Sequence, residues 1–202
     1  MKVLKTVIVM FSLLFSAFAA NAQKVEAEAD DFTILKGQKS INIEFNYDKV
    51  AVGDYAKESE YVKNKTNDMN AKEAGTGDAW AARWNMARID RYHPKFDEVF
   101  TKWAEMTLDT AAKYTLIVKI TFIEPGYQIA IQKKASQIEG MIYLVETAKK
   151  TKKLATATIE RSGGMFRGGA FDFETRIAET YAVAARDLGK IVKKGMDKKV
   201  KD

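Results

Sequence analysis

The feature that most constrains the fold is the alternation of apolar residues between Tyr114 and Glu124. Every second position belongs to one apolar face, formed by Leu116, Val118, Ile120 and Phe122. The intervening face is mixed, because Ile117 and Ile123 alternate there with Lys119 and Thr121. Side chains of a strand point to opposite faces in turn, so this pattern predicts a strand with one buried face and one partly covered face.

Further strands are predicted on both sides of this one. The alternating segments are 40–47, 127–131, 136–147 and 153–161. Pro125-Gly126 suits the centre of a type II turn, and the polar run 148–152 suits a hairpin tip. Strands that follow one another closely usually pair antiparallel, so the segments after Tyr114 predict a meander. We expect the earlier strand, 40–47, to join the same sheet.

Four helices are predicted around this sheet, over 57–74, from Ala79 to about Arg91, after Pro94, and from Asp172 or Thr175 to about Lys194. The last helix has the clearest apolar stripe, formed by Ile177, Tyr181, Ala184, Leu188 and Ile191. Gly195 suits its end, and His93-Pro94 suits the end of the helix that starts at Ala79. We therefore predict an α+β fold. Its antiparallel sheet would have about four or five strands in the order β-ααα-βββ(β)-α, with helices mainly on one face.

The first 22 residues have the pattern of a secretory signal peptide. Lys2 and Lys5 precede an apolar stretch, and Ala20-Asn21-Ala22 fits the small-x-small cleavage rule. The apolar stretch is shorter than the roughly 20 residues that a bilayer span needs, and no later stretch is long enough. We expect cleavage after Ala22 and export to the periplasm or the exterior. The mature chain would have a partly disordered leader at 23–39, a single domain at 40–195 and a basic tail at 196–202.

Composition excludes several classes of site. The chain has no cysteine, so it can form neither a disulfide nor a thiolate metal site. Its formal net charge of +6 would fall to +4 on export, because the signal peptide removes two lysines and no acidic residue. This mild positive charge permits anionic lipid or glycan partners. Since the protein is expected to be exported, we expect no nucleic acid partner.

The predicted helix from Ala79 to Arg91 has the most informative surface. Ala82, Met86 and Ile89 share one side, which we expect to face the core. A second side interleaves tryptophan and arginine, and its members are Trp80, Arg83, Trp84, Arg88 and Arg91. Such a face could stack a sugar ring or bind an acidic group. In the alternative interpretation both tryptophans pack under a neighbouring helix, while the arginines reach water and pair with Asp97, Glu98 or Glu105.

Two other surfaces are candidates for contacts. The glycine-rich segment Ser162 to Gly169 contains Met165 and Phe166, which could contact a partner or fold back over the sheet. Its sequence lacks the lysine-serine/threonine ending of a phosphate-binding loop. Lysines gather at 133–134, at 149–153 and in the tail from 193 to 201, and they would form a basic rim if the sheet placed them at one edge. The alternative is a set of solubilising tips.

The sequence offers little for catalysis. His93 is the only histidine, and Pro94 interrupts the helix that would align it with Asp90 and Asp97. We therefore predict no metal site, no cofactor and no histidine-dependent triad. A pair of catalytic carboxylates needs no local motif, so a glycan-directed hydrolase stays open as an alternative.

Three segments carry a resemblance to a known group of proteins. They are Ile123-Glu124-Pro125-Gly126-Tyr127, Gly163-Gly164-Met165-Phe166 and the run Phe171 to Ile177. Together they resemble uncharacterised exported α+β proteins of Gram-negative bacteria, over roughly 75–194. The resemblance implies a small domain of the cell envelope and transfers no catalytic residue.

These observations favour a non-enzymatic periplasmic or secreted module that binds or scaffolds an envelope protein or glycan. The alternatives are the carboxylate hydrolase and a binder of anionic lipid or polysaccharide through the lysine rim.

Overall fold

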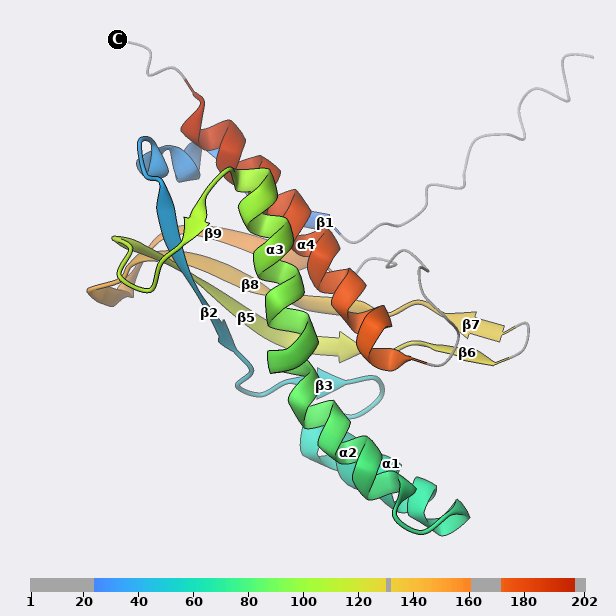
Figure 1. Cartoon of the computed structure of the whole chain (residues 1–202). Coiled ribbons are helices and arrows are strands. Elements are labelled where there is room, and N and C mark those ends of the chain that lie inside the picture. Colours follow the sequence, from blue (N-terminus) through green and yellow to red (C-terminus); the bar gives the residue numbers. More distant parts are fainter. Residues whose placement is uncertain (1–23, 130–131, 161–171, 199–202) are drawn as a thin grey trace, which may run out of the picture.

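The computed structural model of the protein describes residues 24–129, 132–160 and 172–198 (Figure 1). The strands are β1 (Lys24–Glu26), β2 (Ser40–Asn46), β3 (Ala51–Val52), β4 (Thr107–Leu108), β5 (Tyr114–Glu124), β6 (Tyr127–Ile129), β7 (Gln132–Lys134), β8 (Gln137–Glu146) and β9 (Lys149–Glu160). The α-helices are α1 (Glu58–Lys72), α2 (Thr76–Ala87), α3 (His93–Ala104) and α4 (Phe173–Met196). A 3₁₀ helix, η1, spans Ala29–Leu35, and a π-helix, η2, spans Arg88–Tyr92.

Among the described residues, the main sheet has seven strands with mixed pairing, and helices accompany it. The α+β class is therefore confirmed, but the predicted antiparallel sheet of four or five strands is wrong. Its order is β1-β9-β8-β5-β2-β4, with β3 also paired to β5. The predicted meander is present in part, as the antiparallel run β5-β8-β9, which β1 extends. The strand predicted at 127–131 does not belong to this run, because β6 pairs with β7 in a separate two-stranded sheet. However, β2 and β3 pair parallel with β5. The reason is the helical connection from β3 to β4, which carries the chain back along the sheet, as parallel pairing requires.

The predicted alternation of β5 holds only as far as Ile120. A bulge lies between Ile120, which pairs with Gly140, and Phe122, which pairs with Glu139. A bulge inserts one extra residue and so exchanges the two faces beyond it. Ile123 therefore replaces Phe122 in the hydrophobic core, where Ile123 is fully buried.

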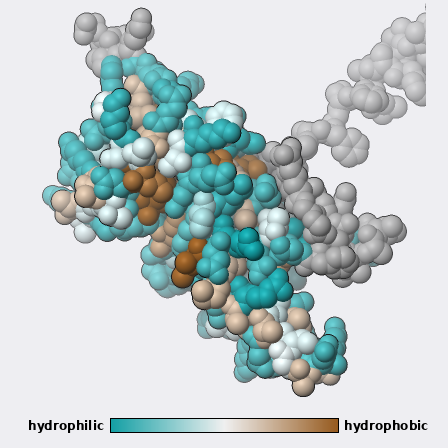
Figure 2. Space-filling view, in the orientation of Figure 1, coloured by the Kyte–Doolittle hydropathy of each residue, from teal (hydrophilic) through white to brown (hydrophobic). Residues whose placement is uncertain are grey.

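Helices α3 and α4 lie side by side across one face of the sheet (Figure 1), and mainly hydrophilic residues cover this side of the molecule (Figure 2). The expected stripe of α4 is confirmed, because Ile177, Tyr181, Ala184 and Leu188 are fully buried. Asp172 caps this helix by accepting the backbone N–H of Glu174 at 2.9 Å. Within the described residues, no helix has the length and apolarity that crossing a bilayer would need.

The segment 24–39, most of the predicted leader, contains β1 and η1. Strand β1 pairs with β9, and Phe32 and Leu35 of η1 are completely buried. Helix α4 ends at Met196, one residue beyond the predicted stop at Gly195. The segment η1 packs so closely against Gly195 that a Cβ there would lie 2.4 Å from the carbonyl oxygen of Ala29. The partner of this segment lies at the other end of the chain, so no local pattern revealed it.

Helices α2 and α3 are continuous through η2, although the sequence predicted a break at His93-Pro94. The backbone N–H of His93 donates to the carbonyl of Arg88, five residues earlier. Pro94 lies in the first turn of α3, where a missing N–H costs no hydrogen bond. The π-turn thus lets the chain pass Pro94 without ending the helix.

Candidate ligand-binding cleft

Helix α2 presents the side opposite to the predicted one toward the core. Trp80 and Trp84 are only 8% and 3% exposed, whereas Met86 and Ile89 are 50% and 64% exposed. Ala82, the third residue of the expected core side, is also exposed. Two indoles bury more apolar area than an alanine, a methionine and an isoleucine, so the tryptophans decide which side packs.

The tryptophans belong to an aromatic cluster contributed by three helices. Tyr61 of α1 lies 5.7 Å from Trp80 and 5.1 Å from Trp84, measured between ring centroids. Phe173, the first residue of α4, lies 5.5 Å from Trp84 and 5.9 Å from Trp80. The cluster therefore joins α1 and α2 to the start of α4. The tryptophans pack against neighbouring helices, as in the alternative interpretation of the sequence.

The arginines of α2 and η2 do not pair with Asp97, Glu98 or Glu105. The Arg83 guanidinium donates to both carboxylate oxygens of Glu174, at 2.9 and 2.8 Å, and this hydrogen bonding raises the pKa of Arg83. Arg88 donates to Glu58 at 2.5 Å.

Arg88 also lies over an aromatic ring, whereas Arg91 is set apart from the cluster. The Arg88 guanidinium is 3.8 Å from the centroid of the Tyr47 ring. Arg91 is exposed and lines a separate hollow beside Pro94 and Thr175. The five residues predicted to form one face therefore do not act together. Two are buried in the core, two form ion pairs, and Arg91 lies on a separate surface.

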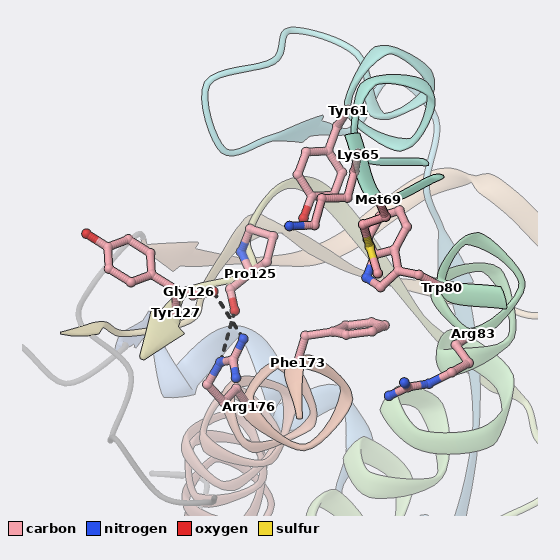
Figure 3. A pocket seen from close by; sticks show the side chains of 10 residues that line it. All are labelled: Tyr61, Lys65, Met69, Trp80, Arg83, Pro125, Gly126, Tyr127, Phe173 and Arg176. Carbon is pink, nitrogen blue, oxygen red and sulfur yellow. Dashed lines mark hydrogen bonds between the residues drawn. The ribbon is translucent and has the colours of Figure 1, made fainter. Parts of the chain in front are cut away.

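A cleft of about 340 Å³ opens beside the aromatic cluster (Figure 3). Its walls come from α1, α2, the β5–β6 turn and the first turn of α4. The lining residues are Tyr61, Lys65, Met69, Trp80, Arg83, Pro125, Gly126, Tyr127, Phe173 and Arg176. Four of these are aromatic, three are cationic and none is acidic. Pockets that hold small ligands are typically of this size or somewhat larger and are rich in aromatic side chains.

Side chains from several elements hold the β5–β6 turn, one wall of the cleft, through hydrogen bonds to its backbone. Arg176 donates to the carbonyl oxygens of Pro125 at 3.4 Å and Gly126 at 3.1 Å, as the dashed lines in Figure 3 show. Ser136 donates to the Pro125 carbonyl at 2.6 Å. Gly126 has a φ of 65°, which confirms the glycine predicted for this turn. Burial lowers the pKa of Arg176.

Glu124 completes the support of this turn. Its Oε1 accepts the backbone N–H of Gly126 at 3.0 Å, and its Oε2 pairs with the Lys134 ammonium at 2.6 Å. Glu124 is 7% exposed, and each of its carboxylate oxygens has a partner. Glu124 therefore acts as a structural anchor of the cleft wall.

A second depression of about 350 Å³ adjoins the first. It shares Tyr61, Lys65 and the turn residues 125–127 with the cleft, and it adds Gly53, Asp54, Tyr55, Glu124 and Lys134. Burial, and secondarily the charge of Glu124, raises the pKa of Tyr61 to about 12, so its hydroxyl is neutral at ordinary pH. The two depressions form an elongated surface with a cationic half and a half of mixed charge.

His93 lies away from the cleft in a packed polar cluster. Its ring stacks on Phe45 with centroids 3.9 Å apart, and its Nε2 is 2.9 Å from the Tyr47 hydroxyl, which also lies 3.1 Å from the Tyr181 hydroxyl. Burial and the charge of Arg88 lower the pKa of His93 to about 4. Across the described ranges, no group of three histidine or acidic side chains could hold a metal ion.

Two of the three lysine groups lie at opposite ends of the sheet. Lys134 lies at the end of the sheet where β5 finishes, because Glu124 pairs with Gln137 there. Lys149–Lys153 lie at the opposite end, where Tyr114 pairs with Glu146. Figure 1 shows the β6–β7 hairpin and the β8–β9 turn at opposite ends of the sheet. Met165 and Phe166, and the glycine-rich segment around them, lie outside the described residues.

Trp80 and Arg83 are the two predicted site residues that line the cleft. Sequence reasoning missed Tyr61, Lys65 and Met69, although their spacing of four places them on one side of α1. It also missed Phe173 and Arg176, which are three residues apart at the start of α4. These spacings are present in the sequence, but no local pattern indicates that these faces of α1 and α4 meet at the β5–β6 turn.

The sequence matches no protein-family model and no curated protein sequence. Among solved structures, the fold is similar to that of a PelC dodecamer variant from Paraburkholderia phytofirmans. That match has 10% sequence identity and a TM-score of 0.36, and it covers 83% of this chain and 98% of that chain. A second PelC dodecamer structure from the same organism matches with 10% identity and a TM-score of 0.32, covering 81% and 97%.

Proposed function

We propose that the protein is a non-enzymatic, exported binding module of the cell envelope, in the periplasm or outside the cell. Its cleft between α1, α2, α4 and the β5–β6 turn would hold an envelope glycan or protein. The proposal of export rests on the signal-peptide pattern that ends at Ala22.

One observation carries the assignment of the cleft. Aromatic and cationic side chains from three separate helices converge on one hollow, and none of the described residues that line it has a carboxylate. The aromatic walls are fixed by mutual packing, and the turn is fixed by Arg176, Ser136 and Glu124. A rigid, concave and chemically mixed surface favours binding, because little conformational entropy is lost when the ligand arrives.

The same geometry favours binding over hydrolysis. The most buried carboxylate beside the cleft, Glu124, already accepts from Gly126 and pairs with Lys134. A general acid or base must instead reach the proton that it transfers. We therefore expect the ligand to be recovered unchanged after incubation with the protein.

Photo-crosslinking in cells tests the proposal. A photoreactive residue at Met69, which lines the cleft, is compared with one at Lys63, an exposed residue of the same helix that does not line it. We expect light-dependent adducts, identified as protein or glycan by mass spectrometry, at position 69 only. Equal adducts at both positions, or none at either, would show that the cleft is not the binding surface.

A further inference from the structure

We infer that the cleft recognises an acidic sugar, namely a hexuronic acid residue within a glycan chain. This inference rests on the proposed binding function and specifies its ligand. It follows from which charges in the cleft are already paired, from the arrangement of the rings, and from which backbone groups are already used.

Lys65 is the cation of the cleft that no described residue engages, whereas Arg176 is bonded to the carbonyl oxygens of the turn. Arg83 is held by Glu174, and Lys134 in the adjoining depression is held by Glu124. In the described part of the chain Lys65 pairs with no carboxylate, and its ammonium points into the cleft in Figure 3. An anionic ligand group would give this ammonium the partner that it lacks, through a charge-assisted hydrogen bond.

The rings favour a saccharide as the carrier of that anion. Tyr61 and Trp80 meet at an interplanar angle of 75°, and Phe173 lies on the other side of Trp80, so the rings bound the cleft from different directions. Aromatic faces carry partial negative charge. They attract the C–H bonds of a sugar ring, which carry partial positive charge. The Tyr61 and Tyr127 side chains add hydroxyl groups that can hydrogen-bond to sugar hydroxyls.

The adjoining depression favours a chain over a single sugar. It continues from the cleft along Tyr61 and the turn, and it exposes Asp54 and Tyr55 to the next residue of a ligand. Mixed charge there suits hydroxyl groups, which both donate and accept hydrogen bonds.

The turn disfavours a peptide ligand. Peptides are commonly bound through main-chain hydrogen bonds. The polar backbone groups that the turn would offer are already engaged: the Pro125 carbonyl by Ser136, the Gly126 N–H by Glu124 and the Gly126 carbonyl by Arg176. An acidic peptide would find the cation of the cleft but few backbone partners.

Calorimetric titration of the mature protein tests the inference with three probes. They are a tetramer of galacturonic acid, its methyl ester and a tetramer of glutamic acid. We expect the free acid to bind at least about 10-fold more tightly than the ester, which lacks the charge. We also expect it to bind more tightly than the peptide and to weaken as salt rises.

Variants locate the charge. Lys65→Gln should weaken binding of the free acid about 10-fold, the scale of one hydrogen bond to a charged group. Lys63→Gln, its exposed neighbour outside the cleft, should change the affinity less than about 2-fold. Circular dichroism of both variants checks that they fold.

Different results would overturn the proposed binding function and the inference of an acidic sugar. Equal affinity for acid and ester, tighter binding of the peptide, or an unchanged affinity in Lys65→Gln would overturn the inference of an acidic sugar. If adducts nevertheless form at position 69 and not at 63, the binding function stands with another ligand. Absence of both saccharide binding and cleft-specific adducts would overturn both proposals.

Discussion

The indole N–H of Trp84 donates to Oε1 of Glu58 at 2.7 Å, and the same oxygen accepts a hydrogen bond from Arg88 at 2.5 Å. This carboxylate joins the start of α1 to α2 and η2. It also satisfies the polar atom of a tryptophan that is otherwise packed among rings. The arrangement explains how Trp84 can lie in the core although its helix is lined with arginine.

Glu58→Ala should lower the free energy of unfolding by about 1–3 kcal/mol, because it leaves the Trp84 N–H and the half-buried Arg88 without their acceptor. Urea denaturation measures the change. Glu60→Ala, which removes an exposed pairing with Lys57 on the same helix, is the matched control and should cost less than about 0.5 kcal/mol. Equal losses in the two variants would contradict a special role for Glu58.

Gly189→Ala should destabilise the protein, although alanine normally stabilises a helix interior relative to glycine by about 0.5–1 kcal/mol. A Cβ at this position would lie 2.7 Å from the Cβ of Trp103 and 3.1 Å from the backbone nitrogen of Ala104. The contact would force α3 and α4 apart at an expected cost of about 1–3 kcal/mol. A thermal melt gives the sign directly: a higher melting temperature would show that the two helices are less closely packed.

Two partly buried titrating groups should affect stability in opposite directions as pH falls. The pKa of His93 is lowered from 6.5 to about 4, so the unfolded chain takes up this proton first, and stability is lost as pH falls from 6.5 to 4. Burial raises the pKa of Asp97 from 3.8 to about 6. This carboxyl takes up its proton first in the folded state, and stability is gained as pH falls from 6 to 4.

Variants separate these two effects. Between pH 7 and pH 4.5, His93→Gln should become more stable relative to the wild type, and Asp97→Asn less stable. Both groups are partly exposed, so solvent screening limits each difference to about 1–2 kcal/mol. Urea denaturation at both pH values measures them. Parallel pH profiles for wild type and both variants would contradict the assigned pKa shifts.

The parts of the fold that were predicted correctly are those in which apolar residues repeat regularly within a single helix or strand. The stripe of α4 and the alternation of β5 up to Ile120 each repeat within one element, and a single buried face enforces the pattern. The bulge after Ile120 interrupts that pattern with no glycine or proline at that point of β5, because the glycine at the bulge, Gly140, lies on the paired strand β8. The parallel pairing of β2 with β5 depends on a connection of three helices between them. No local pattern in either strand indicates this connection.

The errors around the cleft have a common physical origin. The two sides of α2 are both partly apolar, so the choice between them depends on which neighbours are available, namely Tyr61 and Phe173. Phe173 is more than 80 residues away in sequence. The cleft itself arises where α1, the β5–β6 turn and α4 meet, so it could not be predicted from any one of them.

The central claim is that ligand binds in this cleft, and methyl NMR of methionine tests it most directly. Met69 lines the cleft, whereas Met86 is 50% exposed on the outer side of α2 and does not line it. With methionine methyl groups labelled, the galacturonic acid tetramer, and separately a glycan fraction of the envelope, are added to the mature protein. The account predicts a saturable shift of the Met69 resonance and a nearly constant Met86 resonance. A saturable shift at Met86 with Met69 unchanged would place binding on the outer face of α2 and contradict the account.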